Sequence, residues 1–287
     1  MPGDSRNTAR KANQTSATPE GYVEPNIPNQ RANVPFTSQI TTQHGPTNSL
    51  GRFFLDAYAH VYSFGVRLSL EPIADLVHIN AQNRDSWPPL VSIFDARLGS
   101  VNEDNCFCIV GRDRNGRAVY TQAARLYDCD ATSMPPNFCN VVETLNHVYP
   151  DPQNAIARGE AWLPQDDARQ AMSNITGRFA FSGAAWCHPE HRKRGFTGII
   201  PRIARAYAHT LWNTKHTVTF MTEAVVRGGQ MRKTGYTNLA WAVETKKTSM
   251  GNIRFGFLWM STDQMISDLE TTSTSRGSQV DRGVVVG

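Results

Sequence analysis

Residues 187–199 read Cys187-His188-Pro189-Glu190-His191-Arg192-Lys193-Arg194-Gly195-Phe196-Thr197-Gly198-Ile199. The segment before them, residues 177–186, is apolar, rich in small residues and short, which predicts a largely buried strand. After them, apolar residues recur at helical spacing from Ile199 to Trp212 and predict a helix. The stretch is therefore a basic, glycine-containing turn between a strand and a helix.

This turn has the composition of an anion-binding site. The start of a helix presents backbone N–H groups and the positive end of the helix dipole. Gly195 and Gly198 would let the backbone wrap closely around a phosphate, and Arg192, Lys193 and Arg194 add positive charge. The alternative is a solvated basic turn that begins an ordinary helix.

Downstream of this helix, the sequence predicts a further strand, an interrupted helix and two more strands. His216–Thr222 alternates and is rich in β-branched residues, which predicts a strand. Glu223–Lys233 predicts a short helix interrupted by two glycines. Two further strands are predicted after the pair Gly235-Tyr236, at Thr237–Val243 and Asn252–Met260.

Across residues 175–260 this order resembles the GNAT superfamily of CoA-dependent N-acyltransferases. Its pyrophosphate loop, Arg/Gln-x-x-Gly-x-Gly/Ala, is matched by residues 192–197, with Thr197 in place of Gly or Ala, and its Gly-Phe pair by Gly235-Tyr236. The resemblance implies binding of acetyl-CoA or another acyl-CoA as co-substrate, without a metal. The residues implied in binding are Cys187, Arg192, Lys193, Arg194, Gly195, Phe196, Thr197 and Gly198.

The fold implied by the resemblance is α+β, with a mixed, mostly antiparallel sheet flanked by helices. Its central parallel strands, here Phe179–Trp186 and His216–Thr222, are splayed. Upstream, the sequence predicts two helices, near residues 50–62 and 73–79, and a strand at Pro89–Phe94. An Asn-Gly turn at residues 113–116 predicts a hairpin, with strands at Cys106–Arg112 and Arg117–Tyr127.

Composition divides the chain into a central domain and two tails. Residues 1–45 are polar with few large apolar side chains, which predicts a disordered tail. Residues 46–267 form the GNAT-like domain, with a helical insertion at about 131–174 that is rich in proline. Residues 268–287 are expected to be a flexible C-terminal tail.

The catalytic groups implied by the resemblance are only partly present. Glu223 ends a predicted strand and is the candidate base; the alternative is a carboxylate stabilised at a helix N-terminus. Family members commonly carry an acid tyrosine four residues before the glycine of the pair, and here that position is Met231. Tyr236 then takes the aromatic core position. His188 and His191 are interpreted as phosphate neighbours or surface residues.

Composition excludes several other classes of protein. The 287 residues are 40% hydrophobic and 19% charged, which is typical of soluble globular proteins. No apolar run approaches the ~20 residues needed to cross a bilayer, and no apolar segment follows the N-terminal basic residues, so a cytoplasmic protein without membrane contact is expected. The 29 basic and 25 acidic residues are interspersed, which disfavours nucleic-acid binding.

The five cysteines show no CxxC pair, which argues against structural zinc and a disulfide framework. Cys187 adjoins the basic turn, whose charge could lower the pKa of its thiol.

The reaction that the resemblance implies is transfer of an acetyl or other acyl group to an amine of a small molecule or protein. The alternative is a non-catalytic GNAT-fold protein that binds acyl-CoA. Oligomeric state is left open, with Asn252–Met260 as a pairing edge if it is an outer strand.

Overall fold

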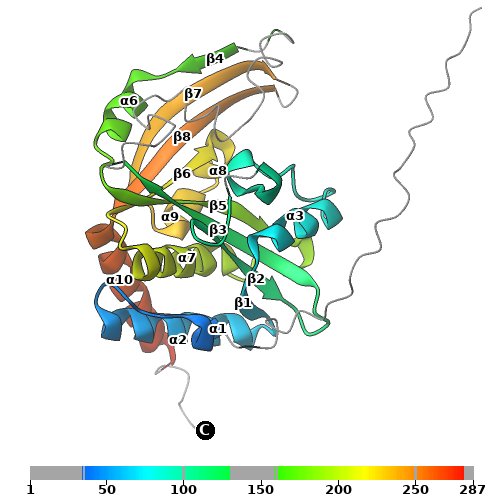
Figure 1. The fold of residues 1–287 in the computed structure, drawn as a ribbon, viewed down its shortest axis with the longest axis vertical. Coiled ribbons are helices and arrows are strands. Elements are labelled where there is room, and N and C mark those ends of the chain that lie inside the picture. The colour runs from blue at the N-terminus through cyan, green and yellow to red at the C-terminus, as the bar shows by residue number, and fades with distance from the viewer. Residues whose placement is uncertain are drawn as a thin grey trace, which may run out of the picture.

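The structure is a computed structural model, and it describes residues 36–98, 101–129, 161–248 and 251–280, together with residues 34 and 159 (Figure 1). The described strands form one sheet in the order β1-β2-β3-β5-β6-β8-β7-β4. Their bounds are β1 Arg67–Glu71, β2 Cys106–Arg112, β3 Ala118–Asp128, β4 Ala161–Pro164, β5 Arg178–Cys187, β6 His216–Thr222, β7 Asn238–Thr248 and β8 Gly251–Ser261.

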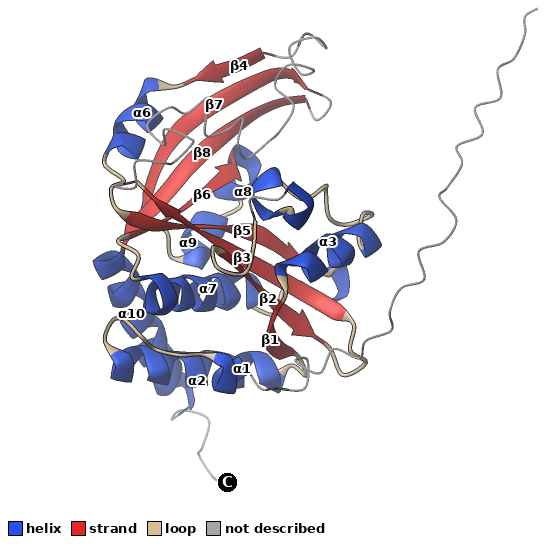
Figure 2. Cartoon of the chain, in the orientation of Figure 1, coloured by secondary structure: helices blue, strands red, loops and turns tan. Residues whose placement is uncertain are grey.

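Helices precede, separate and follow these strands. The described α-helices are α1 Phe36–Gln39, α2 Thr47–Ser63, α3 Ile73–Gln82, α6 Asp166–Ser173, α7 Phe196–Trp212, α8 Glu223–Arg227, α9 Gln230–Thr234 and α10 Thr262–Val280. Strands β4, β7 and β8 extend away from α2, α7 and α10 as a curved arm (Figure 2). The predicted helix at 199–212 and the helix broken at Gly228-Gly229 are both confirmed, because their signals are local.

The pairing of β5 with β6 is the one parallel pairing among the described strands. It covers three residue pairs, from Phe179↔His216 to Phe181↔Val218. Beyond Phe181, β5 stays paired with β3, and beyond Val218, β6 stays paired with β8. The two strands therefore diverge in mid-sheet. The fold class is confirmed as a mixed, mostly antiparallel sheet with splayed central parallel strands, flanked by helices.

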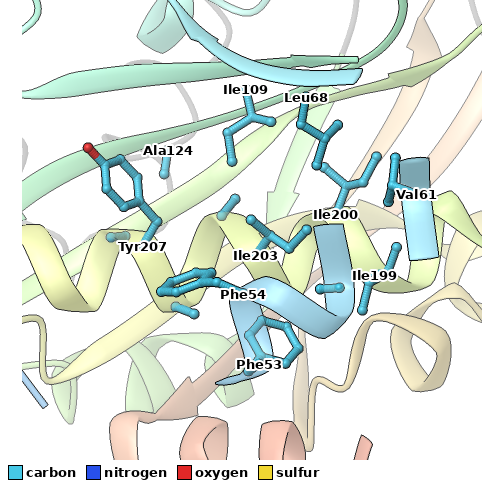
Figure 3. Packing of buried hydrophobic residues seen from close by; sticks show 14 of the residues in the cluster. Phe53, Phe54, Val61, Leu68, Ile109, Ala124, Ile199, Ile200, Ile203 and Tyr207 are labelled. Atoms are coloured by element: carbon cyan, nitrogen blue, oxygen red, sulfur yellow. The ribbon is translucent and has the colours of Figure 1, made fainter. Parts of the chain in front are cut away.

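The sheet has a separate hydrophobic core on each face. On one face, Phe53 and Phe54 of α2 meet Ile200 and Ile203 of α7 below Ile109 of β2 (Figure 3). Each such side chain contributes roughly 1.5–3 kcal/mol by leaving water. The other core is formed mainly by α3, α6 and the aromatic residues of β5, β6 and β8. Helices thus hold both faces of the sheet at the point where β5 and β6 separate.

Two predictions about strands are wrong. The expected strand at 89–94 contains instead a 3₁₀ helix, η2 (Ser92–Phe94), whose three residues are all buried. A short, fully buried apolar run does not distinguish a strand from a buried helical turn. The predicted strand near 252–260 is present as β8, but it lies between β6 and β7, so it is not a pairing edge. The outer strands of the described sheet are β1 and β4.

The N-terminal boundary differs from the expected position. Residues 1–33 and 35 lie outside the described residues, but α1 falls within the segment predicted to be disordered. Phe36 is fully buried and stacks on Tyr58 at 6.4 Å, and the Gln39 side chain accepts a hydrogen bond from the Leu70 backbone at 2.8 Å. The buried Phe36 ring and the Gln39 hydrogen bond together hold this turn against the core.

The C-terminal boundary and the insertion also differ in detail. Helix α10 passes through residue 268, where a flexible tail was expected, because Leu269 is buried and Asp268 is ion-paired with Arg202. Most of the expected insertion, residues 131–158 and 160, lies outside the described residues. Its described part contains β4 and α6, and β4 pairs with β7. The insertion therefore contributes a strand as well as a helix.

Candidate functional site

A cavity of about 570 Å³ lies where β5 and β6 diverge. Ser182–Cys187 of β5 and Thr219–Thr222 of β6 form two of its walls, immediately beyond the last parallel pair. Thr197 of α7, Gln230 of α9 and Tyr236 also line it. The cavity is therefore a direct consequence of the strand separation.

A β-bulge shapes the β5 wall of the cavity. Thr121 of β3 pairs with Trp186 and Ala123 pairs with Gly183, so two β5 residues stand opposite Gln122. One of them, Ala184, has a positive φ of 50°, which is uncommon for a residue with a side chain. A bulge of this kind bends the strand and redirects its backbone groups. Gln122 Nε2 stabilises the bulge by donating to the Gly183 carbonyl at 2.9 Å.

The cavity has walls from both faces of the sheet. Tyr120, Cys187 and Tyr236 belong to the core that includes α7, whereas Trp186 and Phe255 belong to the opposite core. None of the described residues that line the cavity carries a charged side chain. Two molecules could therefore approach each other through the gap from opposite sides in weakly polar surroundings.

The basic turn connects two walls of the cavity. It leaves β5 at Cys187 and enters α7 at Gly195, which has a φ of 80° at the N-cap position. Glycine adopts this left-handed conformation without strain, whereas Lys193 in the same turn adopts a φ of 65° with a side chain present. The turn is tied to the β2–β3 hairpin by an ion pair between Arg117 and Glu190 at 2.7 Å. An exposed basic loop thus leads directly into the first turn of α7.

Two of the predicted binding residues line the cavity, namely Cys187 and Thr197. Burial raises the pKa of the Cys187 thiol, and this outweighs the opposing effect of Arg192 and Arg194. The expectation that the basic turn could lower this pKa is therefore wrong. Phe196 is 1% exposed and packs edge-on against the ring of Phe64, so its side chain belongs to the core.

The other predicted binding residues lie in the turn or behind it. Arg192 and Lys193 are exposed, while Arg194 is partly exposed and donates to the Glu190 carbonyl at 3.3 Å. Gly198 faces α9, because a Cβ added there would lie 3.2 Å from the Lys233 carbonyl oxygen. Gly198 thus allows α9 to approach α7 closely, a role that its position in the motif did not predict.

Pro201 occupies the interior of α7 without leaving a carbonyl unsatisfied. Proline has no N–H to donate to the carbonyl four residues earlier, which here is that of Thr197. Gln230 Nε2 donates to this carbonyl at 2.9 Å from α9. Thr197, Pro201 and Gln230 all line the cavity. The proline therefore creates an acceptor that holds α9 at the cavity wall.

Glu223 is the first residue of α8 and lies beside the cavity, between the lining residues Thr222 and Val225. Its Oε1 accepts a hydrogen bond from Arg227 Nη2 at 2.7 Å, one turn later in the same helix. Its side chain is 29% exposed. The position is compatible both with a base that acts through water and with a helix N-terminal carboxylate.

Tyr236 is the lining residue whose importance the sequence did not reveal. Its position after Gly235 predicted only an aromatic core residue, and it is indeed 5% exposed and part of the α7 core. It also lines the cavity, with the guanidinium of Arg205 4.8 Å from the centre of its ring. A glycine-aromatic pair carries no signal for a side chain that lines a cavity.

Within the described ranges, no group of three His, Cys, Asp or Glu side chains is placed to hold a metal ion. Among the helices of the same ranges, none combines the length and the hydropathy that crossing a membrane requires.

No protein-family model and no curated protein matches the chain. Solved structures that resemble it include spermidine N-acetyltransferase from Vibrio cholerae in an intermediate state, with 12% identity and a TM-score of 0.42 over 70% of this chain and 96% of that chain. The same enzyme in complex with CoA and spermine has 13% identity and a TM-score of 0.41, over 71% and 99% of the two chains. The fold is therefore assigned from this chain's own strand order and pairing.

Proposed function

We propose that the chain is an acyl-CoA-dependent N-acyltransferase that transfers an acetyl or other acyl group to an amine of a small molecule or protein. The observation that carries this proposal is the cavity between β5 and β6, just beyond the three parallel pairs. Where two strands separate, the unpaired edge of each strand presents a row of backbone N–H donors and carbonyl acceptors. An extended amide-containing arm, such as the pantetheine of CoA, fits such a gap.

The basic turn is proposed to hold the pyrophosphate of the acyl-CoA. Gly195 begins α7 without a side chain, and the helix start offers backbone N–H groups to an anion. Arg192 and Lys193 are exposed beside it, and guanidinium groups form strong charge-assisted hydrogen bonds with phosphate oxygens. Because the turn leads from Cys187 to Thr197, an acyl-CoA bound here could extend its arm between the two strands.

The bulge on β5 is proposed to lie at the thioester. Attack by an amine forms the C–N bond and places negative charge on the carbonyl oxygen, which fixed donors stabilise best where water is excluded. The redirected backbone at Ala184 and Ala185 and the neutral walls of the cavity suit that requirement. Collapse of the intermediate then breaks the C–S bond and releases CoA.

A non-catalytic acyl-CoA-binding protein is the second candidate. Met231 stands where the resemblance implies an acid tyrosine, and it is only partly buried against the α7 core. Glu223 is engaged by Arg227 and is not among the residues that line the cavity. These features favour a protein that has kept the cofactor turn and lost the acid.

A thiol-release assay tests the enzyme against the binding protein. With acetyl-CoA and pooled amines, the full chain is expected to release free thiol faster than with acetyl-CoA alone, because aminolysis liberates one CoA per acyl group transferred. Mass spectrometry of the amine pool then identifies the acylated product. Binding of acetyl-CoA without amine-dependent thiol release would favour the second candidate.

Glu223 remains the proposed base, and Glu223→Gln tests it in the same assay. A base that removes the ammonium proton is expected to lower kcat at least tenfold when replaced, with acetyl-CoA affinity unchanged. Arg227→Gln is the matched control, because it breaks the same 2.7 Å contact and leaves the carboxylate in place. Equal small losses of kcat in both variants would indicate that Glu223 stabilises α8 and does not act as the base.

A further inference from the structure

The cavity presents different chemistry on the two faces of the sheet. The face that carries α7 contributes the polar side chains of Thr197 and Gln230, and the basic turn leads into α7 on that face. Lining residues that belong to the opposite core or pack against it are Ala184 and Trp186 of β5, Phe220 of β6 and Phe255 of β8. Thr222, which pairs with Phe255, adds an uncharged hydroxyl. On this second face the described lining is therefore a mainly aromatic wall.

Packing fixes the aromatic side chains of this wall. Trp186 stacks on Trp87 with ring centres 5.4 Å apart, and its indole N–H donates to the Ser86 hydroxyl at 3.1 Å. Phe220 packs against Phe257 with ring centres 5.6 Å apart. The indole N–H of Trp186 already has its partner, so this wall requires no polar group from a ligand. Rigid aromatic side chains offer apolar contact area at a low cost in conformational entropy.

None of the described lining residues carries a charge that would balance a cation on this wall. Glu223 adjoins the lining residue Thr222, but its carboxylate pairs with Arg227 at 2.7 Å. Bringing a charged group into such surroundings is unfavourable unless a partner compensates it. During acyl transfer the attacking nitrogen loses its proton and becomes a neutral amide, whereas a second ammonium on the same molecule keeps its charge. The wall therefore disfavours acceptors with more than one amino group.

We propose that the acceptor is an arylalkylamine, a molecule with one amino group joined by a short alkyl chain to an aromatic ring, and not a polyamine. This inference rests on the proposed acyltransferase function and names the substrate class of the same cavity. The ring of the acceptor packs against Trp186, Phe220 and Phe255, and its amino group points into the gap between β5 and β6. Acyl-CoA bound at the basic turn and an amine on the aromatic wall then meet from opposite faces of the sheet.

Three amines test this class in the thiol-release assay with the full chain and acetyl-CoA. Butylamine and putrescine share a four-carbon chain and differ by one ammonium group. The kcat/KM is expected to be at least about tenfold higher for butylamine, because the second ammonium of putrescine has no partner on the wall. Phenethylamine adds a ring to a single amino group, and its kcat/KM should exceed that of butylamine by about tenfold or more.

Val225→Glu tests the wall from the side of the protein. Val225 lines the cavity and is 42% exposed, so a carboxylate fits there without being buried. It offers the second ammonium of putrescine a partner, so the preference for butylamine over putrescine should fall about threefold or more. Leu55→Glu is the matched control, because Leu55 is 60% exposed on α2 and does not line the cavity. It should keep the wild-type preference.

The outcomes separate the acceptor class from the function beneath it. The expected order of the three amines, with a preference that changes in Val225→Glu and not in Leu55→Glu, supports the arylalkylamine. Turnover of putrescine equal to or faster than that of phenethylamine overturns the acceptor class, while the acyltransferase proposal stands. An unchanged preference in Val225→Glu overturns the placement of the acceptor on this wall. Absence of amine-dependent thiol release with every amine, the pooled amines included, overturns both proposals.

Discussion

Replacing Asp268 with Asn is expected to lower the free energy of unfolding by about 3 kcal/mol or more. The carboxylate accepts two hydrogen bonds from Arg202, and it is the acidic group that the described residues place near the fully buried Arg205. Without its charge, Arg205 keeps the Thr234 carbonyl and the face of the Tyr236 ring, and neither carries a charge to balance a buried cation. A charge left unpaired in the interior is among the costliest single changes in a protein.

Urea denaturation of the full chain measures this loss. Asp263→Asn is the matched control, because Asp263 lies exposed in the first turn of the same helix and its removal should cost less than about 1 kcal/mol. Asp268 is also closely packed, because a Cβ added at Gly235 would clash with its carboxylate. The stability loss in Asp268→Asn should therefore exceed the loss in Asp263→Asn. Equal effects of the two substitutions would show that the buried cation does not depend on α10.

Ala185→Trp is expected to weaken acetyl-CoA binding more than 100-fold, about 2.7 kcal/mol. Ala185 lines the cavity and is exposed on the bulged segment of β5, so an indole there would occupy the gap between the strands without replacing core atoms. The stability of the protein should change little, because the substitution disturbs no buried contact. A loss of binding would then show that the indole occupies space between the strands that acetyl-CoA needs.

Calorimetric titration with acetyl-CoA measures this effect, and urea denaturation checks the stability. Ala59→Trp is the matched control, because Ala59 is also exposed but lies on α2, away from the cavity. It should bind acetyl-CoA as wild type does. Wild-type affinity in Ala185→Trp would place the acyl-CoA elsewhere on the protein.

The sequence predicted those parts of the fold whose signals are local. The turn at residues 187–199 indicated a strand before it and a helix after it, and the structure has β5 and α7 there. The strand His216–Thr222 has the predicted bounds. From these elements and the resemblance, the splayed sheet could be expected from the sequence alone.

The remaining features depend on contacts between distant segments. Neither the bulge at Ala184 nor the hydrogen bond from Gln230 to Thr197 can be read from spacing, because each joins two segments that meet only in the folded chain. The same holds for the contact between Arg205 and Tyr236, which are separated by thirty-one positions. The sequence predicted an aromatic core position for Tyr236, but it did not predict that Arg205 is buried. The motif therefore indicated a basic turn at the start of α7, whereas the contact between Arg205 and Tyr236 follows only from packing.

Titration of the wild-type full chain with acetyl-CoA tests most directly whether the protein has the acyl-CoA site proposed between β5 and β6. We expect saturable binding at one site per chain, with Kd between about 1 µM and 1 mM, the usual range for enzyme substrates. Absence of binding at several times the upper end of that range would contradict it.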